Sequence, residues 1–278
     1  MTSIFPEVSE MGKMEKMYNY LFVEHSVSLS REWPLISSPL PLTLIIIGYL
    51  FFVLYAGPRY MKNRPPYELR TFMLLYNSIQ ILTNLWMVQE HLSFGWFSEY
   101  GVTCATTLAL NSPKALKIFN NIWWLMLLKI FDLVETCTFV LRKKDNQVSF
   151  LHVYHHATNI LFVWIYLKYI LDARATLISL INCTVHVIMY MYYFISARGP
   201  KYQRIMSPLK PFITRIQMVQ FLAIIIYMIQ FANPICSLDG QICYTIGTIF
   251  GVNILINLAL FYNFYKKSYT NVSKGKKS

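Results

Sequence analysis

Long stretches without Asp, Glu, Lys or Arg dominate this sequence. A helix needs about 20 predominantly apolar residues to cross the hydrocarbon core of a bilayer. Uncharged runs of about this length occupy Leu35–Gly57, Thr71–Gln89, Val148–Leu167, Ala175–Ala197, Ile216–Cys236 and Gln241–Tyr265. A seventh run, Ile118–Leu141, is equally apolar apart from three ionisable residues. The pattern predicts an all-α, multi-pass membrane protein with seven transmembrane helices.

The composition supports a membrane protein. Hydrophobic residues make up 55% of the 278 residues and charged residues only 14%, whereas soluble domains carry about 25% charged residues. The segments between the runs are too short for a soluble domain. Residues 1–278 are therefore expected to form a single transmembrane domain.

The basic residues predict the orientation of the chain. Seven helices place the termini on opposite sides, and most of the 25 Lys and Arg residues fall on the C-terminal side, which the positive-inside rule makes cytosolic. Residues 1–34 would be lumenal, and residues 266–278 would form a cytosolic tail. That tail ends in KGKKS, which resembles the di-lysine retrieval signal of endoplasmic reticulum membrane proteins. The net charge of +12 fits this topology and attraction to phosphates better than nucleic-acid binding, because the basic residues lie beside helix ends.

Four of the runs carry polar residues. An ionisable group inside a bilayer costs roughly 2.5 to more than 10 kcal/mol, so such residues normally mark function. The polar residues are Lys129, Asp132, Glu135 and Thr136; His152, His155 and His156; Asn182, His186, Tyr190 and Tyr193; and Thr214, Gln217 and Gln220. On a rise of about 1.5 Å per residue, members of all four helices lie roughly 7–17 Å from the cytosolic helix ends. Spacings of three and four residues place them on shared faces. We expect one buried polar site in the cytosolic half of the membrane.

Structural roles stay open for part of this set. Gln, Asn and Thr often only join membrane helices, which applies to Thr214 and Gln220. A Lys–Asp or Lys–Glu contact within one helix can be a neutralised structural pair. Three histidines within five residues, with a fourth on the next helix, are harder to explain by packing alone.

Clustered neutral imidazoles serve two chemistries. One is metal binding, since membrane di-iron desaturases and hydroxylases use HxxHH segments. Those enzymes, however, assemble more histidines than the six of this chain. A zinc site of three or four histidines is also open. The other is nucleophilic or general-base catalysis, with Lys129, Asn182 and the glutamines holding an oxyanion. The second outlines an acyl-transfer or Claisen site. Cys183, one turn before His186, is a minor candidate nucleophile.

Taken together, the motifs resemble the ELO family, the elongases of very-long-chain fatty acids, over most of the chain. They read MKNRPPYELRTFMLLYN, KIFDLVETCTFVLRKKDNQVSFLHVYHH, NCTVHVIMYMYY and TRIQMVQF. The HVYHH form is similar to the animal branch of the family. The resemblance implies a seven-helix protein of the endoplasmic reticulum membrane in which six helices surround a tunnel for the acyl chain.

The resemblance also implies a reaction, the condensation of long-chain acyl-CoA with malonyl-CoA to 3-oxoacyl-CoA, carbon dioxide and CoA, without metal or other cofactor. His155 would form an acyl-imidazole, His186 would lie against the reacting carbons, and His152 and His156 would orient groups or exchange protons. The expected substrate-binding residues are Lys129, Asp132, Glu135, Asn182, Tyr190, Tyr193, Gln217 and Gln220. Expected partners are the two CoA substrates and membrane lipid; the reductases and dehydratase of the elongation cycle and a second copy of the chain are compatible with the family.

Two positions depart from the family pattern. The third helix reads KxxDxxET where the family usually has KxxExxDT. The acids at Asp132 and Glu135 are therefore exchanged relative to the family, and the length of the side chain at each position differs by one methylene. Cys183 replaces a frequent Ser, which argues against it as the nucleophile.

The remaining cysteines predict a disulfide. Cys104, Cys236 and Cys243 fall on the lumenal side, where disulfides persist. A Cys104–Cys236 bond would tie two inter-helix segments together, and Cys243 could replace Cys236 because connectivity cannot be read from sequence.

Two rival functions follow from the same features. The first is a metal-dependent membrane desaturase or hydroxylase. The second is a seven-helix receptor, which shares the helix count but does not explain a histidine cluster at one depth.

Overall fold

The computed structural model describes residues 12–97, 112–232 and 241–270, and these residues contain helices and no β-strand. The prediction of an all-α fold is confirmed for this part of the chain. The α-helices are α1 (Lys13–Asn19), α2 (Leu40–Phe51), α3 (Gly57–Met61), α4 (Arg70–Leu92), α5 (Pro113–Leu141), α6 (Phe150–Ile165), α7 (Thr176–Ala197), α8 (Pro200–Met206), α9 (Lys210–Ile229) and α10 (Gln241–Tyr265).

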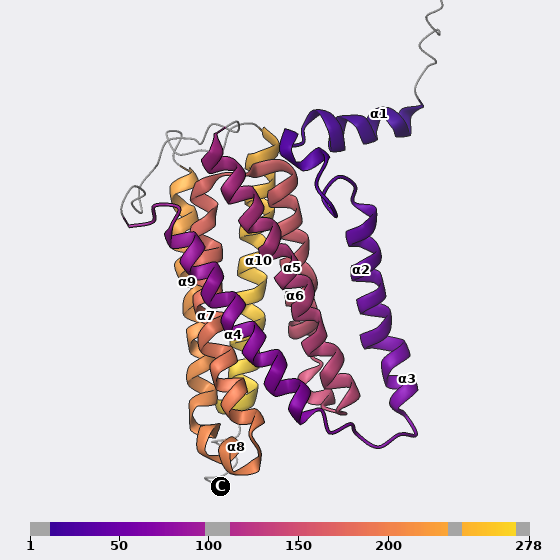
Figure 1. The fold of residues 1–278 in the computed structure, drawn as a ribbon, viewed down its shortest axis with the longest axis vertical. Coiled ribbons are helices and arrows are strands. Elements are labelled where there is room, and N and C mark those ends of the chain that lie inside the picture. Colours follow the sequence, from indigo (N-terminus) through magenta and orange to yellow (C-terminus); the bar gives the residue numbers. More distant parts are fainter. Residues whose placement is uncertain (1–11, 98–111, 233–240, 271–278) are drawn as a thin grey trace, which may run out of the picture.

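Six of these helices form a ring. Contacts join α5 to α6, α6 to α10, α10 to α9, α9 to α7, α7 to α4, and α4 back to α5. Helix α1 lies beside one end of this bundle, above α2, and α8 lies at the opposite end (Figure 1). We refer to these as the α1 end and the α8 end.

Helices α2 and α3 stand outside the ring, against α5 and α6 (Figure 1). Two indole N–H groups hold the segment that precedes α2, because Trp123 donates to the carbonyl of Pro34 at 3.0 Å and Trp164 to that of Leu35 at 2.9 Å. Further along, the Tyr49 hydroxyl donates to Thr136 at 3.0 Å. These bonds fix α2 on the bundle.

A π-helical turn, Phe52–Ala56, joins α2 to α3. In it the N–H of Gly57 donates to the carbonyl of Phe52, and Pro58 follows directly. A proline has no N–H to offer a regular helix, and a π-helical turn is a common way to absorb such an interruption. The helical segment therefore continues past Pro58 to Met61.

Four helical segments of the described residues are long and apolar enough to cross a membrane: Leu40–Met61, Ala173–Ala197, Pro200–Ile229 and Ile242–Thr270. The chain is a multi-pass membrane protein. Helices α4 and α5 are less apolar because they carry many polar side chains. In α4 these are buried inside the bundle: Asn77, Gln80, Asn84 and His91.

Local caps determine where two central helices begin. The Ser112 hydroxyl accepts from the N–H of Ala115 at 3.1 Å, so α5 begins at Pro113. The Ser149 hydroxyl accepts from the N–H of His152 at 3.3 Å, so α6 begins just before the histidines. Serine at such a position satisfies a backbone donor that the helix cannot. The HxxHH segment thus occupies the first two turns of α6, at the α8 end.

The proposed disulfide pair, Cys104 and Cys236, and the KGKKS sequence at the end of the tail lie outside the described residues. The Cys243 thiol donates to the carbonyl of Tyr169 at 3.4 Å.

Candidate active site

A buried ion pair joins three helices of the ring. Lys129 Nζ on α5 lies 3.3 Å from Asp132 Oδ2, and the two residues are only 4% and 2% exposed. Asp132 Oδ1 accepts from Gln80 Nε2 of α4 at 2.7 Å and from the Tyr190 hydroxyl of α7 at 3.4 Å. Lys129 Nζ also lies 3.5 Å from His186 Nδ1. A charged pair away from water needs such additional partners to be tolerated.

His155 is held by two amides. Its Nδ1 lies 3.1 Å from Asn257 Oδ1 on α10, and its Nε2 lies 3.0 Å from Asn159 Nδ2, one turn further along α6. The rings of Phe221 and Phe261 stand edge-on to the imidazole. Both ring nitrogens therefore have an amide neighbour, and the side chain is fixed in direction.

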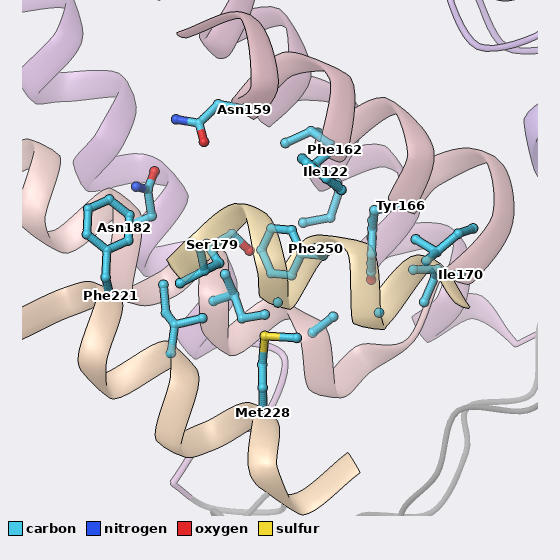
Figure 2. Close-up of a pocket in the computed structure, with 18 of the residues that line it drawn as sticks. Ile122, Asn159, Phe162, Tyr166, Ile170, Ser179, Asn182, Phe221, Met228 and Phe250 are labelled. Atoms are coloured by element: carbon cyan, nitrogen blue, oxygen red, sulfur yellow. The ribbon is translucent and has the colours of Figure 1, made fainter. Parts of the chain in front are cut away.

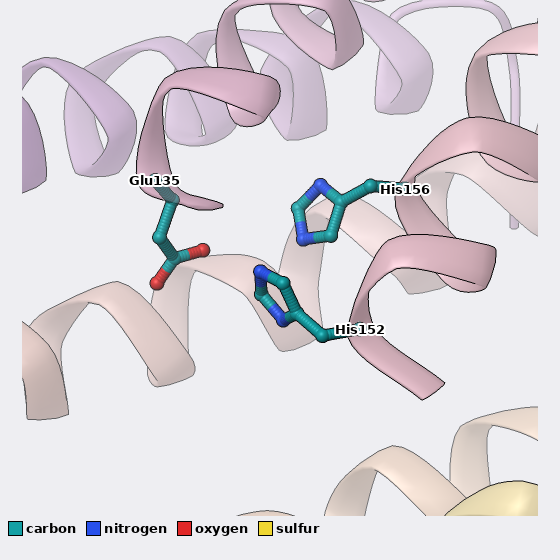
Figure 3. A group of neighbouring side chains, drawn as sticks. All are labelled: Glu135, His152 and His156. Atoms are coloured by element: carbon teal, nitrogen blue, oxygen red, sulfur yellow. The ribbon is translucent and has the colours of Figure 1, made fainter. Parts of the chain in front are cut away.

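The other two histidines of α6 face Glu135. In Figure 3 the carboxylate and the rings of His152 and His156 point toward one another, and their ligand-capable atoms lie within 4.8 Å of each other. The two rings are 4.2 Å apart between centroids. Glu135 is 3% exposed, and His152 Nε2 is buried without a hydrogen-bond partner among the described residues. Of the residues that the structure describes, these three form the group best suited to hold a metal ion.

A small space separates His155 from His186. Its other polar lining residues are Asn182, Gln217 and Gln220. The Gln217 amide donates to the Met189 sulfur at 3.3 Å. Two imidazoles and three amides from α6, α7 and α9 therefore converge on one point.

A cavity of about 350 Å³ adjoins this space and shares His155, Asn182 and Gln220 with it; Figure 2 shows part of its lining. Lys129, His155, Asn182 and Gln220 line one end, and Ile170, Phe231 and Tyr244 line the other. Between them the walls are mostly apolar, with Phe162, Phe221, Ile224 and Phe250 among the lining residues. The volume falls in the usual range of ligand pockets, about 300–1,000 Å³.

The length of the cavity can be estimated along α6 and the π-helical turn Tyr166–Ile170 that extends it. Both His155 and Ile170 line it, and at about 1.5 Å per residue they are roughly 22 Å apart along the helix. Side chains of α5, α6, α7, α9 and α10 contribute to the wall, whereas no described residue of α4 does. Five helices of the ring, rather than all six, line the described cavity.

The structure brings together most of the residues that the sequence singled out. Lys129, Asp132, His186 and Tyr190 form one connected group, and His155, Asn182, Gln217 and Gln220 adjoin it through the small space. Tyr193 is half-buried beside Tyr190, with ring centroids 6.0 Å apart. Cys183 is fully buried and lines neither space.

Three contacting residues were missed at the level of sequence: Gln80, Asn159 and Asn257. Each is an amide in an uncharged run, which is also what an interhelical contact looks like. A usable signal was the pairing of amides four residues apart, Gln80 with Asn84 and Asn253 with Asn257, because that spacing places both on one helix face.

Comparison with known proteins places the chain in a family. The profile of the ELO: GNS1/SUR4 family matches residues 34–277. The chain belongs to this family. It is similar to very long chain fatty acid elongase 1 of Mus musculus, 37% identical over 268 residues that cover 96% of this chain and 93% of that protein. Very long chain fatty acid elongase 1 of Homo sapiens is 37% identical, and the match covers 92% of this chain and 89% of that protein. Very long chain fatty acid elongase 7 of Rattus norvegicus is 36% identical, and the match covers 86% of this chain and 84% of that protein.

In this ELO-family chain the exchanged acids have different neighbours. The shorter Asp132 pairs with Lys129 on its own helix, one turn away. The longer Glu135 extends toward α6 and faces His152 and His156. Both carboxyl groups are therefore inside the site, but they have separate neighbours.

Proposed function

We propose that this protein is a very-long-chain fatty acid elongase, an acyltransferase that condenses long-chain acyl-CoA with malonyl-CoA to 3-oxoacyl-CoA. Relatives that match most of the chain carry the elongase name. The observation that supports the proposal most strongly is the long apolar cavity with His155 at one end, because a fatty acyl chain is narrow and apolar and ends in a thioester.

The first half of the reaction uses His155. With the acyl chain in the cavity, a ring nitrogen of His155 attacks the thioester carbonyl. The nitrogen–carbon bond forms, the carbon–sulfur bond breaks, and CoA leaves as a thiolate. Lys129 and the amides of Asn182 and Gln220 line the same end of the cavity, where N–H donors stabilise the charge that develops on the carbonyl oxygen.

The second half forms the new carbon–carbon bond. Malonyl-CoA loses carbon dioxide, and the resulting carbanion attacks the acyl carbon held on His155. The bond to the imidazole breaks, and His155 returns to its starting form. His186 adjoins the reacting position and contacts Lys129, so the two supply a hydrogen bond and a positive charge to the enolate of the incoming thioester.

The group of Glu135, His152 and His156 serves this chemistry without a metal ion in our proposal. A carboxylate beside two imidazoles can orient their rings and exchange protons with them. Membership of the ELO family favours this reading over a metal-dependent desaturase, and we propose no resident cofactor.

We further propose that seven helices cross the membrane, namely α2 with α3, α4, α5, α6, α7, α9 and α10, in the endoplasmic reticulum with the α8 end in the cytosol. The length of the ring helices and the burial of the polar side chains of α4 support this arrangement. Arginines near the α8 end, such as Arg70, Arg198 and Arg215, would attract the CoA phosphates. Protease protection of terminal tags in sealed microsomes would test it: only a C-terminal tag should be cleaved.

Product analysis tests the function. Membranes containing the protein are supplied with labelled malonyl-CoA and a panel of acyl-CoAs, with His155→Ala and His25→Ala in parallel. His25 is an exposed histidine at the α1 end and serves as the matched control. We expect labelled 3-oxoacyl-CoA with wild type and His25→Ala, and at least about a 100-fold loss with His155→Ala. Absence of any two-carbon addition by wild type would contradict the proposed function.

A further inference from the structure

Asn257 is a fully buried amide on α10 whose orientation is determined by a backbone group. Its Nδ2 lies 2.9 Å from the carbonyl oxygen of Asn253, and the residue is 0% exposed. A backbone carbonyl can only accept a hydrogen bond. The NH₂ group of Asn257 must therefore face Asn253, since the reversed amide would place two oxygens against each other, and Asn257 Oδ1 must face His155.

This orientation decides which nitrogen of His155 carries the proton. Oδ1 of Asn257 is only an acceptor, so His155 Nδ1, 3.1 Å away, donates to it. A neutral imidazole has one N–H, which leaves a lone pair on Nε2. The NH₂ group of Asn159 lies 3.0 Å from Nε2 and can donate to that lone pair, so both neighbours agree on the same tautomer.

The same tautomer directs the lone pair toward the cavity. Asn159, the neighbour of Nε2, is one of the cavity-lining residues, whereas Asn257, the neighbour of Nδ1, lines neither of the two spaces described above. The nitrogen with the lone pair is therefore the one on the substrate side. A further bond orders the network from outside, because the Tyr154 hydroxyl donates to Asn253 Oδ1 at 2.9 Å.

We propose that Asn257 is a positioning residue that holds His155 as the Nδ1–H tautomer, so that Nε2 is the atom that attacks the acyl thioester. This inference rests on the proposed elongase function. As Nε2 binds the acyl carbon, the hydrogen bond from Asn159 to its lone pair breaks and the thiolate of CoA departs. The proton stays on Nδ1, because an amide oxygen is too weak a base to remove it. The acyl group is then carried on a positively charged imidazolium, which is a better acyl donor to the carbanion than a neutral acyl-imidazole.

The test follows the first half-reaction, the release of CoA from acyl-CoA in the absence of malonyl-CoA. Asn257→Leu has a similar volume and no acceptor, and it should lower the single-turnover rate constant for CoA release by about tenfold or more, with little change in the acyl-CoA concentration that gives half the maximal rate. Asn257→Asp in its neutral acid form keeps a carbonyl oxygen toward Nδ1 and an O–H toward the Asn253 carbonyl, so it should restore most of the rate. Asn77→Leu on α4 is the matched control and should leave the rate unchanged, because this buried amide has no hydrogen-bond partner among the described residues and lines neither space.

Each outcome bears on one claim. If Asn257→Leu and Asn257→Asp lose activity alike, or Asn257→Leu is as active as wild type, the positioning role is wrong while the proposed function stands. If His155→Ala still releases CoA, the proposed nucleophile is wrong and the inference fails with it.

A second measurement reads the tautomer in the wild-type protein and does not depend on the activity of any variant. In nitrogen-15 spectra of histidine-labelled protein, with His155 assigned by its loss in His155→Gln, we expect the protonated resonance at Nδ1 and the unprotonated one at Nε2. The reverse assignment would overturn the proposal.

Discussion

Lys129 and Asp132 place opposite charges one turn apart in the interior of the bundle, each less than 5% exposed. Gln80 and Tyr190 donate to the carboxylate, which offsets part of the cost of removing it from water. Each member of the pair therefore needs the other to be stable in the interior, in addition to any role toward a substrate. A measurement of protein stability can test this independently of activity.

We predict that Asp132→Asn destabilises the protein by about 3–5 kcal/mol, because it leaves the Lys129 ammonium buried without an opposite charge. The double substitution Lys129→Met with Asp132→Leu should cost less than Asp132→Asn alone. Thermal unfolding in detergent measures both. A double variant that is less stable than the single one would show that the residues do not act as a pair.

Removal of metal ions should leave activity unchanged. Although Glu135, His152 and His156 can approach a common ligand, the proposed chemistry uses them as an acid and two bases. The measurement is the rate of condensation after dialysis against a strong chelator and after adding back zinc or iron. A loss that one metal restores would contradict the metal-free mechanism.

At the level of single residues, the sequence identified the ionisable groups but not all of their partners. An Asp, Lys or His inside an apolar run is conspicuous because its burial is costly. Asn257 is not conspicuous in the sequence, since amide side chains are common in membrane helices. Its contact with His155 depends on the rotation of α10 relative to α6, which residue spacing within one helix does not contain.

Among the helices, Gly57 allows α3 to approach α5 closely. A Cβ atom at this position would lie 2.7 Å from both the Phe52 carbonyl oxygen and Val140 Cγ1. By contrast, a Cβ at Gly48 of α2 would meet nothing within 4 Å. The two glycines therefore form a matched pair with opposite expected behaviour.

Gly57→Ala should destabilise the protein by about 1–3 kcal/mol through overpacking. Gly48→Ala should be neutral or stabilising by up to about 1 kcal/mol, because alanine favours a helix. Unfolding temperatures of the two variants check this. Equal effects would mean that the contact between α3 and α5 is looser than described.

Gly251 on α10 offers a way to shorten the cavity. It lines the wall, and a Cβ added there would lie at an ordinary 3.6 Å from Met228 Cε, so Gly251→Leu can be accommodated only by extending into the cavity. Along α10 it is about 9 Å from Asn257 and hence from the level of His155. We predict a shift of substrate preference toward shorter acyl-CoAs.

The control for Gly251→Leu is Val252→Leu on the outer face of α10, where the side chain is 52% exposed. Turnover of a graded series of acyl-CoAs measures the preference of both variants. If Gly251→Leu retains the wild-type profile, the acyl chain does not occupy this cavity.

Helix positions were largely predictable because apolar runs of sufficient length have few other solutions in a membrane. The ends were less so. α5 begins at Pro113 rather than Ile118 because Ser112 caps it. α2 begins at Leu40 rather than Leu35. A proline stands in the first turn of α2, and the segment before it is held by the hydrogen bond from Trp164 to the Leu35 carbonyl.

For the whole molecule, the order of helices around the ring was beyond the reach of the sequence. α4 contacts α7 extensively, and α10 lies between α9 and α6, although these helices are not all consecutive in the chain. α2 stands outside the ring despite being among the most apolar segments. Such choices depend on how side chains of separate helices fit together, which periodicity within one helix cannot specify.

The central claim is that His155 carries the acyl group between the two substrates. Intact mass measurement of the purified protein with acyl-CoA, but without malonyl-CoA, tests it most directly. We expect a mass increase of one acyl group that maps to His155, disappears on addition of malonyl-CoA as 3-oxoacyl-CoA forms, and is absent in His155→Ala. Formation of 3-oxoacyl-CoA without any acylated protein, or acylation at another residue, would contradict the account.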